Sequence, residues 1–376
     1  MKFAEYRKIA ISACCCFAIG FSFISCASKP KLEKKITAGD LDDKSNDPAS
    51  EQLRELFVMN ESGQGKQTLA AFRDFQKQNP NSTYFQSAKF GEAWSLEQMD
   101  SFDEALKIYN SVMEVSKLQW PRLYSRALYR SSFIYEALGE DVKLIASLME
   151  ARNLVEDLPP EVVYTEVPSR LSMIYVKINQ TAEAQKYLKE ADQGLKRLLA
   201  TQPVSNQWLA KMYFQMGSLK LSSMNSENLA FYVQSQRVAQ RYLLSSLSLN
   251  DAVWSEQALK KLTENYSTLW TLIESYKENE KSDSFDRVEA RRQQFLVLGD
   301  YIKLVSEALQ LKPLEEQRMN PYQNKAFDFF EAVEKKSYDF LYSKFDRMSL
   351  TEESLHLNNV KRPGKVIVND LFPNER

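Results

Sequence analysis

The fold is decided by the stretch Ala88-Lys-Phe-Gly-Glu-Ala93-Trp94-Ser-Leu96 and its continuation, Met99-Asp-Ser-Phe102-Asp-Glu-Ala105-Leu-Lys-Ile-Tyr109-Asn-Ser-Val112. The first half places the small residue Ala93 three positions before the large apolar Leu96. The second half places Ala105, Tyr109 and Val112 on one face of a helix. The stretch therefore predicts two helices that pack against each other through a small residue.

Both patterns recur along the chain at a fixed distance. The small-then-large spacing returns as Ser132/Tyr135 and Ser172/Tyr175. The triplet of the second helix returns as Thr68/Phe72/Phe75, Leu144/Leu148/Ala151 and Ala184/Leu188/Ala191. We call the small residues Ala93, Ser132 and Ser172 one column, and the first residues of the triplets, Ala105, Leu144 and Ala184, the other. In each column the successive residues are 39 and then 40 positions apart. Two independent columns in one register indicate a repeat, with turns at Asp100-Ser101, Gly139 and Asn179-Gln180.

This pattern resembles the tetratricopeptide repeat, most closely in Phe102-Asp-Glu-Ala105 and Asn79-Pro-Asn-Ser82. The resemblance covers residues 66–195, and Leu144 stands where the family usually has alanine. It implies an all-α fold, a tetratricopeptide-like helical-hairpin solenoid with additional C-terminal helices. It also implies a protein that works by binding other proteins.

The remaining chain is divided by composition and periodicity. We expect a flexible tether at residues 26–50, the repeats at 51–202, degenerate helical repeats at 203–312, and a C-terminal helix with an irregular tail at 313–376. The spacing of Ala239, Leu243 and Ser246 leaves one further repeat open.

The N-terminus has the parts of an export signal, predicted at residues 1–25. Lys2, Arg7 and Lys8 precede an apolar run that ends at Phe23-Ile24-Ser25-Cys26. This ending resembles the lipobox of bacterial lipoproteins, which implies cleavage before Cys26 and acylation of its thiol with lipid such as palmitate. Ala27-Ser28 then implies sorting to the outer membrane, facing the periplasm. A plain secretory signal or a short membrane anchor are the alternatives.

Composition excludes several kinds of chemistry. The net charge of −1 gives no basic surface for nucleic acid. All four cysteines lie within the first 26 residues, and the single histidine is His356. We therefore expect no catalytic residues, no metal site, no cofactor beyond the lipid at Cys26 and no small-molecule substrate. The segment 63–68 resembles a phosphate loop only faintly, because Asn60 replaces its first glycine and Gln67 the magnesium-binding hydroxyl.

Two aromatic pairs are candidates for partner binding. Phe90 and Trp94 lie four residues apart, and Tyr129 and Phe133 repeat that spacing 39 residues later. In tetratricopeptide proteins these positions point toward the concave surface, so we expect the four rings to form one strip there. Core packing is the competing interpretation.

The sequence as a whole favours a membrane-anchored periplasmic interaction scaffold of the bacterial cell envelope, whose partners are other envelope proteins. It resembles in style the tetratricopeptide lipoproteins that support outer-membrane β-barrel assembly. One alternative is a peptidoglycan-active enzyme on a helical scaffold, for which Glu274-Ser275 is a superficial match. Another is a structural subunit of an envelope motility or secretion machine.

Overall fold

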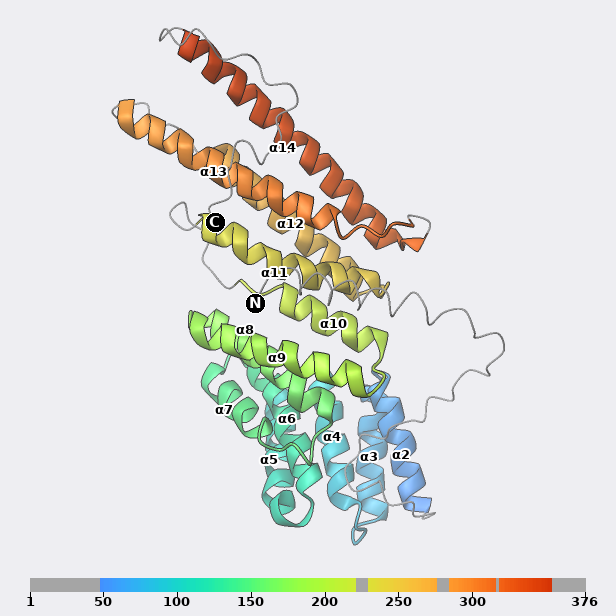
Figure 1. The fold of residues 1–376 in the computed structure, drawn as a ribbon. Coiled ribbons are helices and arrows are strands. Elements are labelled where there is room, and N and C mark those ends of the chain that lie inside the picture. Colours follow the sequence, from blue (N-terminus) through green and yellow to red (C-terminus); the bar gives the residue numbers. More distant parts are fainter. Residues whose placement is uncertain (1–47, 221–228, 276–283, 316–317, 354–376) are drawn as a thin grey trace. The chain divides into compact units, whose positions relative to one another are not determined.

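The computed structural model describes residues 48–220, 229–275, 284–315 and 318–353. Within these ranges the regular elements are helices and none is a strand, which confirms the all-α prediction (Figure 1). The elements are α2 (Pro48–Glu61), α3 (Gly65–Gln78), α4 (Phe85–Gln98), α5 (Phe102–Gln119), α6 (Pro121–Leu138), α7 (Asp141–Ala151), the π-helix η2 (Val162–Glu166), α8 (Val167–Lys177), α9 (Thr181–Thr201), α10 (Asn206–Gly217), α11 (Leu229–Ser248), α12 (Trp254–Ser275), α13 (Ser284–Leu309) and α14 (Pro321–Glu353).

The described residues divide into two compact units, with the boundary between Leu123 and Tyr124 inside α6. The boundary expected from the sequence, between residues 202 and 203, lies inside the second unit. Helix α2 begins at Pro48, so the last three residues of the predicted tether are helical. Proline is well suited to the first turn of a helix, whose N–H groups need no partner within it. Leu53 and Phe57 of this helix are buried, so packing extends it beyond the boundary drawn from composition.

Helices that follow each other in sequence also pack together within each unit. In the first unit α3 contacts α2 and α4, and α4 contacts α5. In the second unit α8 packs on α9, α10 on α11 and α11 on α12. This arrangement is a solenoid-like series of helix pairs.

The residues of the two columns found in the sequence are buried where these helices pack together. The small residues Ala93, Ser132 and Ser172 have no exposed surface. All members of the four second-helix triplets are buried as well, namely Thr68, Phe72, Phe75, Ala105, Tyr109, Val112, Leu144, Leu148, Ala151, Ala184, Leu188 and Ala191. The Ser172 hydroxyl donates a hydrogen bond to the Ala184 carbonyl at 2.8 Å, so here the two columns touch directly. The large partners Tyr135 and Tyr175 differ from the pattern, because both remain partly exposed.

The further repeat that the sequence left open is present as the pair α10–α11. Ala239, Leu243 and Ser246 are buried. The Ser246 hydroxyl donates to the Ala210 carbonyl on α10 at 2.9 Å, a contact like the one between Ser172 and Ala184. The repeated packing therefore continues beyond residue 203.

Three turns between paired helices have the same geometry. Asp100, Gly139 and Asn179 adopt positive φ angles of 57°, 71° and 60°. In each turn the next residue donates its N–H to the carbonyl five positions earlier, and these bonds are Ser101 to Leu96, Glu140 to Tyr135 and Gln180 to Tyr175. This is the Schellman bond, which satisfies a carbonyl at the end of a helix and favours glycine or asparagine at the left-handed position. The turn residues thus repeat with the same 39 and 40 residue steps as the buried columns.

The C-terminal helices share one large apolar core. Aromatic rings from α12, α13 and α14 meet there, with Tyr266, Trp270, Tyr301 and Phe330 all buried. The ring centroids of Tyr266 and Phe330 are 5.0 Å apart in an edge-to-face arrangement. Among the described helices, none combines the length and the apolar character needed to cross a membrane.

Candidate functional site

The predicted lipidation site, Cys26, lies outside the described residues, as do the signal at 1–25 and His356. The four aromatic candidates are all described. Phe90 and Trp94 belong to the first unit, whereas Tyr129 and Phe133 belong to the second, so each pair is considered in its own unit.

In the first unit, Phe90 lies in the core and Trp94 lies partly at the surface. Phe90 is 3 % exposed, and its ring lies 5.6 Å from that of Tyr109 and 6.1 Å from that of Phe57. Trp94 is only partly buried, and its ring lies 6.3 Å from Phe57. Phe90 is therefore a core residue, and Trp94 keeps some accessible surface.

In the second unit, Tyr129 and Phe133 differ in the same way. Tyr129 is 8 % exposed, and Phe133 is partly buried with its ring 5.1 Å from the tyrosine. The prediction that all four rings line a binding strip is thus corrected for Phe90 and Tyr129. Residues four apart share a helical face, but neighbouring helices cover one edge of that face and leave the other accessible.

Tyr129 contacts the buried carboxylate of Glu166, a residue that the sequence analysis did not predict as part of a site. Its hydroxyl donates to Glu166 Oε2 at 2.5 Å. The other oxygen of Glu166 accepts from the indole N–H of Trp208 at 3.0 Å and lies 3.5 Å from Lys211 Nζ. Glu166 therefore joins three neighbouring elements: α6, η2 and α10.

Burial and charge keep the Tyr129 phenol protonated. Desolvation raises its pKa well above the ordinary value, and the adjacent Glu166 carboxylate raises it further against the opposing effect of Arg170. The hydroxyl is consequently a donor to Glu166 over the physiological pH range.

Arg170, one turn beyond Glu166, forms the second half of this network. Its side chain is 5 % exposed, and it donates to Ser132 Oγ at 2.6 Å and to Glu136 Oε2 at 2.6 Å. The guanidinium also lies over the Phe133 ring, 3.8 Å from its centroid. A planar cation stacked on an aromatic face holds that ring in place.

The π-helix η2 supplies the local distortion that positions this network. Such turns contain an extra residue and occur frequently at functional sites. Here Gly194 of α9 lies against η2 so closely that an added Cβ would be 1.8 Å from the Tyr164 carbonyl oxygen. Glu166 is the last residue of η2, and Arg170 lies one turn later in α8.

We refer to these residues of the second unit as the polar–aromatic face: Tyr129, Ser132, Phe133, Glu136, Glu166, Arg170, Trp208 and Lys211. Its buried members satisfy one another, while Phe133, Glu136, Trp208 and Lys211 keep accessible surface. Phe133 is the one predicted site residue that belongs to its accessible part. Glu166 and Arg170 lie within the mostly apolar stretch 162–174, and this contrast is the sequence signal that could have indicated the rest.

In the described part of the chain, no cluster of three or more histidine, cysteine, aspartate or glutamate side chains is suited to a metal ion. Glu274, the superficial match to a catalytic glutamate, lies 3.4 Å from Lys336 Nζ in a partly exposed ion pair. In the segment that resembles a phosphate loop, the Thr68 hydroxyl bonds to the buried Asn60 side chain at 2.8 Å. These contacts connect helices to each other.

No protein-family model and no curated protein matches the sequence. Among solved structures, BtubC (BKLC) from P. vanneervenii is 16% identical, with 86% of this chain and 99% of that chain covered and a TM-score of 0.37. A tetratricopeptide repeat protein from Parabacteroides merdae ATCC 43184 is 11% identical, with 75% and 98% covered and a TM-score of 0.38. The repeat architecture described above follows from the helix pairs, turns and buried columns of this chain itself.

Proposed function

We propose that this protein is an interaction scaffold of the bacterial envelope, anchored by lipid at Cys26, which binds partner proteins through the polar–aromatic face. The observation that carries this proposal is the pair of partly accessible aromatic residues, Phe133 and Trp208, each held by a buried charged group. Aromatic and arginine side chains fixed at the centre of a surface are the usual source of binding energy between proteins.

The fixed geometry of these side chains favours binding, because little conformational entropy is lost when a partner binds. Arg170 holds Phe133, and Glu166 holds the Trp208 indole, so both rings have one position before a partner arrives. Glu136 and Lys211 place one charge of each sign beside the rings. The face therefore suits a partner segment that combines an apolar contact with polar groups.

The binding role is tested by a matched pair of substitutions, Phe133→Ala and Phe329→Ala. Both remove a partly buried phenylalanine of the second unit, so both should lower its stability to a similar extent. Only Phe133→Ala should reduce co-purification of envelope partners, by a factor of roughly 30 if the ring contributes about 2 kcal/mol. Equal recovery of partners with the two variants would count against the proposal.

The lipid anchor at Cys26 can be tested independently of partner binding. Motivated by the lipobox-like ending Phe23-Ile24-Ser25-Cys26, we expect Cys26→Ala to abolish incorporation of labelled palmitate and to release the chain from the outer-membrane fraction. A Cys16→Ala variant, which removes a thiol from within the apolar run, should keep both properties. Retention of label and membrane association by Cys26→Ala would exclude acylation at this residue.

A further inference from the structure

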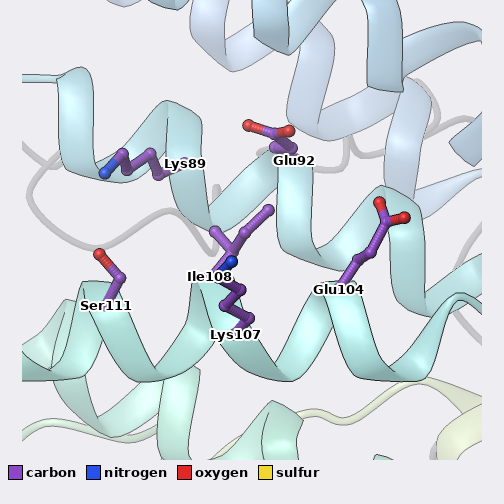
Figure 2. Close-up of a pocket in the computed structure, with 6 residues that line it drawn as sticks. All are labelled: Lys89, Glu92, Glu104, Lys107, Ile108 and Ser111. Carbon is purple, nitrogen blue, oxygen red and sulfur yellow. The ribbon is translucent and has the colours of Figure 1, made fainter.

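The first unit contains a hollow between α4 and α5, with a volume of about 530 Å³ (Figure 2). Two helices contribute its six lining residues, Lys89, Glu92, Glu104, Lys107, Ile108 and Ser111. A volume of this size falls in the range of ordinary ligand pockets. The hollow belongs to the first unit, whereas the polar–aromatic face belongs to the second.

The two carboxylates of the hollow are engaged by Arg73 of α3. Its Nε lies 2.7 Å from Glu92 Oε1, and its Nη2 lies 4.0 Å from Glu104 Oε2. The Gln76 amide donates to the second oxygen of Glu92 at 2.8 Å. These contacts give the Glu92 carboxylate partners at both oxygens, whereas Glu104 remains largely exposed with Arg73 at a distance of 4.0 Å.

The two ammonium groups of the hollow are not balanced in this way. Within the described ranges, neither Lys89 nor Lys107 forms an ion pair with a carboxylate. Glu104 lies three positions before Lys107, a spacing that permits a pair on one helix, but its partner is Arg73. Lys89 Nζ lies over the Phe85 ring, 5.4 Å from its centroid. Counting Arg73 with the lining residues, three cationic groups face two carboxylates, so the hollow carries one net positive charge.

The remaining lining residues add two further properties. Ser111 offers a hydroxyl that can donate a hydrogen bond, and Ile108 offers an apolar contact between the charged groups (Figure 2). From Glu104 to Ser111 the hollow follows α5 for about 10 Å. About three residues of an extended chain cover that length.

We propose that this hollow binds an acidic segment of a partner protein. The side-chain carboxylates of the segment pair with Lys89 and Lys107, and an apolar side chain of the segment contacts Ile108. Charge complementarity favours this occupant, because Arg73 engages Glu92 at 2.7 Å and neither lysine has a carboxylate partner among the described residues.

The test uses the purified full-length chain and a fluorescein-labelled octapeptide, Asp-Asp-Leu-Leu written twice and amidated at its C-terminus, because this order places aspartate and leucine side chains on the same face of an extended chain. Fluorescence anisotropy at low ionic strength should show binding that the double variant Lys89→Gln/Lys107→Gln weakens about tenfold, since each ion pair contributes modestly. A peptide with asparagine in place of every aspartate should bind as weakly to the wild-type chain as the acidic peptide binds to this variant.

The matched control is Lys66→Gln/Lys77→Gln, which removes the same two charges from exposed positions of α3 in the same unit. It should bind the acidic peptide as wild type does. If this control loses as much affinity as the hollow variant, only the net charge of the unit matters and the site is excluded. Equal binding of the asparagine peptide would also overturn the proposal, and neither result would bear on the Phe133 test.

Discussion

Replacing Gly194 with alanine should destabilise the second unit by about 3 kcal/mol, one of the two largest effects we expect from a single substitution. The added Cβ would lie 1.8 Å from the Tyr164 carbonyl oxygen and 2.6 Å from its carbon. Backbone atoms cannot rotate away as a side chain can, so α9 and η2 must separate. Urea unfolding followed by far-UV circular dichroism measures the loss.

Gly65→Ala is the control for that experiment. This glycine also lies in a helix, but the nearest atom to its added Cβ is Gln98 Oε1, the far end of a flexible side chain, at 2.6 Å. The nearest backbone atom, the Ser95 carbonyl oxygen, would be 3.1 Å away instead of 1.8 Å, so movement of the glutamine should make this substitution much less costly. A Gly194→Ala protein as stable as the Gly65→Ala protein would show that α9 and η2 are not so closely packed.

Replacing Glu166 with alanine should have an effect of similar size, about 3 kcal/mol. The substitution leaves the Tyr129 hydroxyl and the Trp208 indole N–H without their acceptor, and Lys211 without its counter-ion. A buried donor that loses its partner costs about 1–3 kcal/mol, and here two donors are affected together. Glu166→Gln keeps one carbonyl acceptor and should recover part of the loss.

The matched control is Glu264→Ala on α12. This glutamate is more than half exposed, and its contact with Lys260 is 4.0 Å long. Its removal should change the free energy of unfolding by no more than about 0.5 kcal/mol. Were the Glu166 and Glu264 variants equally stable in urea, the buried network would contribute nothing to the fold.

The repeat itself was predictable because its determinants are local and periodic. Small residues such as Ala105 and Ala184 mark where helices approach closely, and Asp100, Gly139 and Asn179 mark where the chain turns. Each of these depends on one residue type at one position, so a single sequence reveals them. The 39 and 40 residue steps of the buried columns and of the turns agree for this reason.

The candidate site was predictable only in part, because its contacts join helices whose relative rotation the spacing does not fix. Glu166 and Arg170 lie four residues apart, a spacing that alone indicates an ion pair on one helix. Each instead bonds to other helices, Glu166 to Tyr129 and Trp208, and Arg170 to Ser132 and Glu136. The π-turn that brings them there has no signature in the apolar periodicity.

Photo-crosslinking in intact cells can show whether the polar–aromatic face binds partner proteins. A photoreactive phenylalanine analogue is placed at position 133 in one strain and at position 329 in another, both in the full-length chain. We expect discrete adducts with other proteins from position 133 and none above background from position 329. Adducts from position 329 without any from position 133 would contradict this expectation.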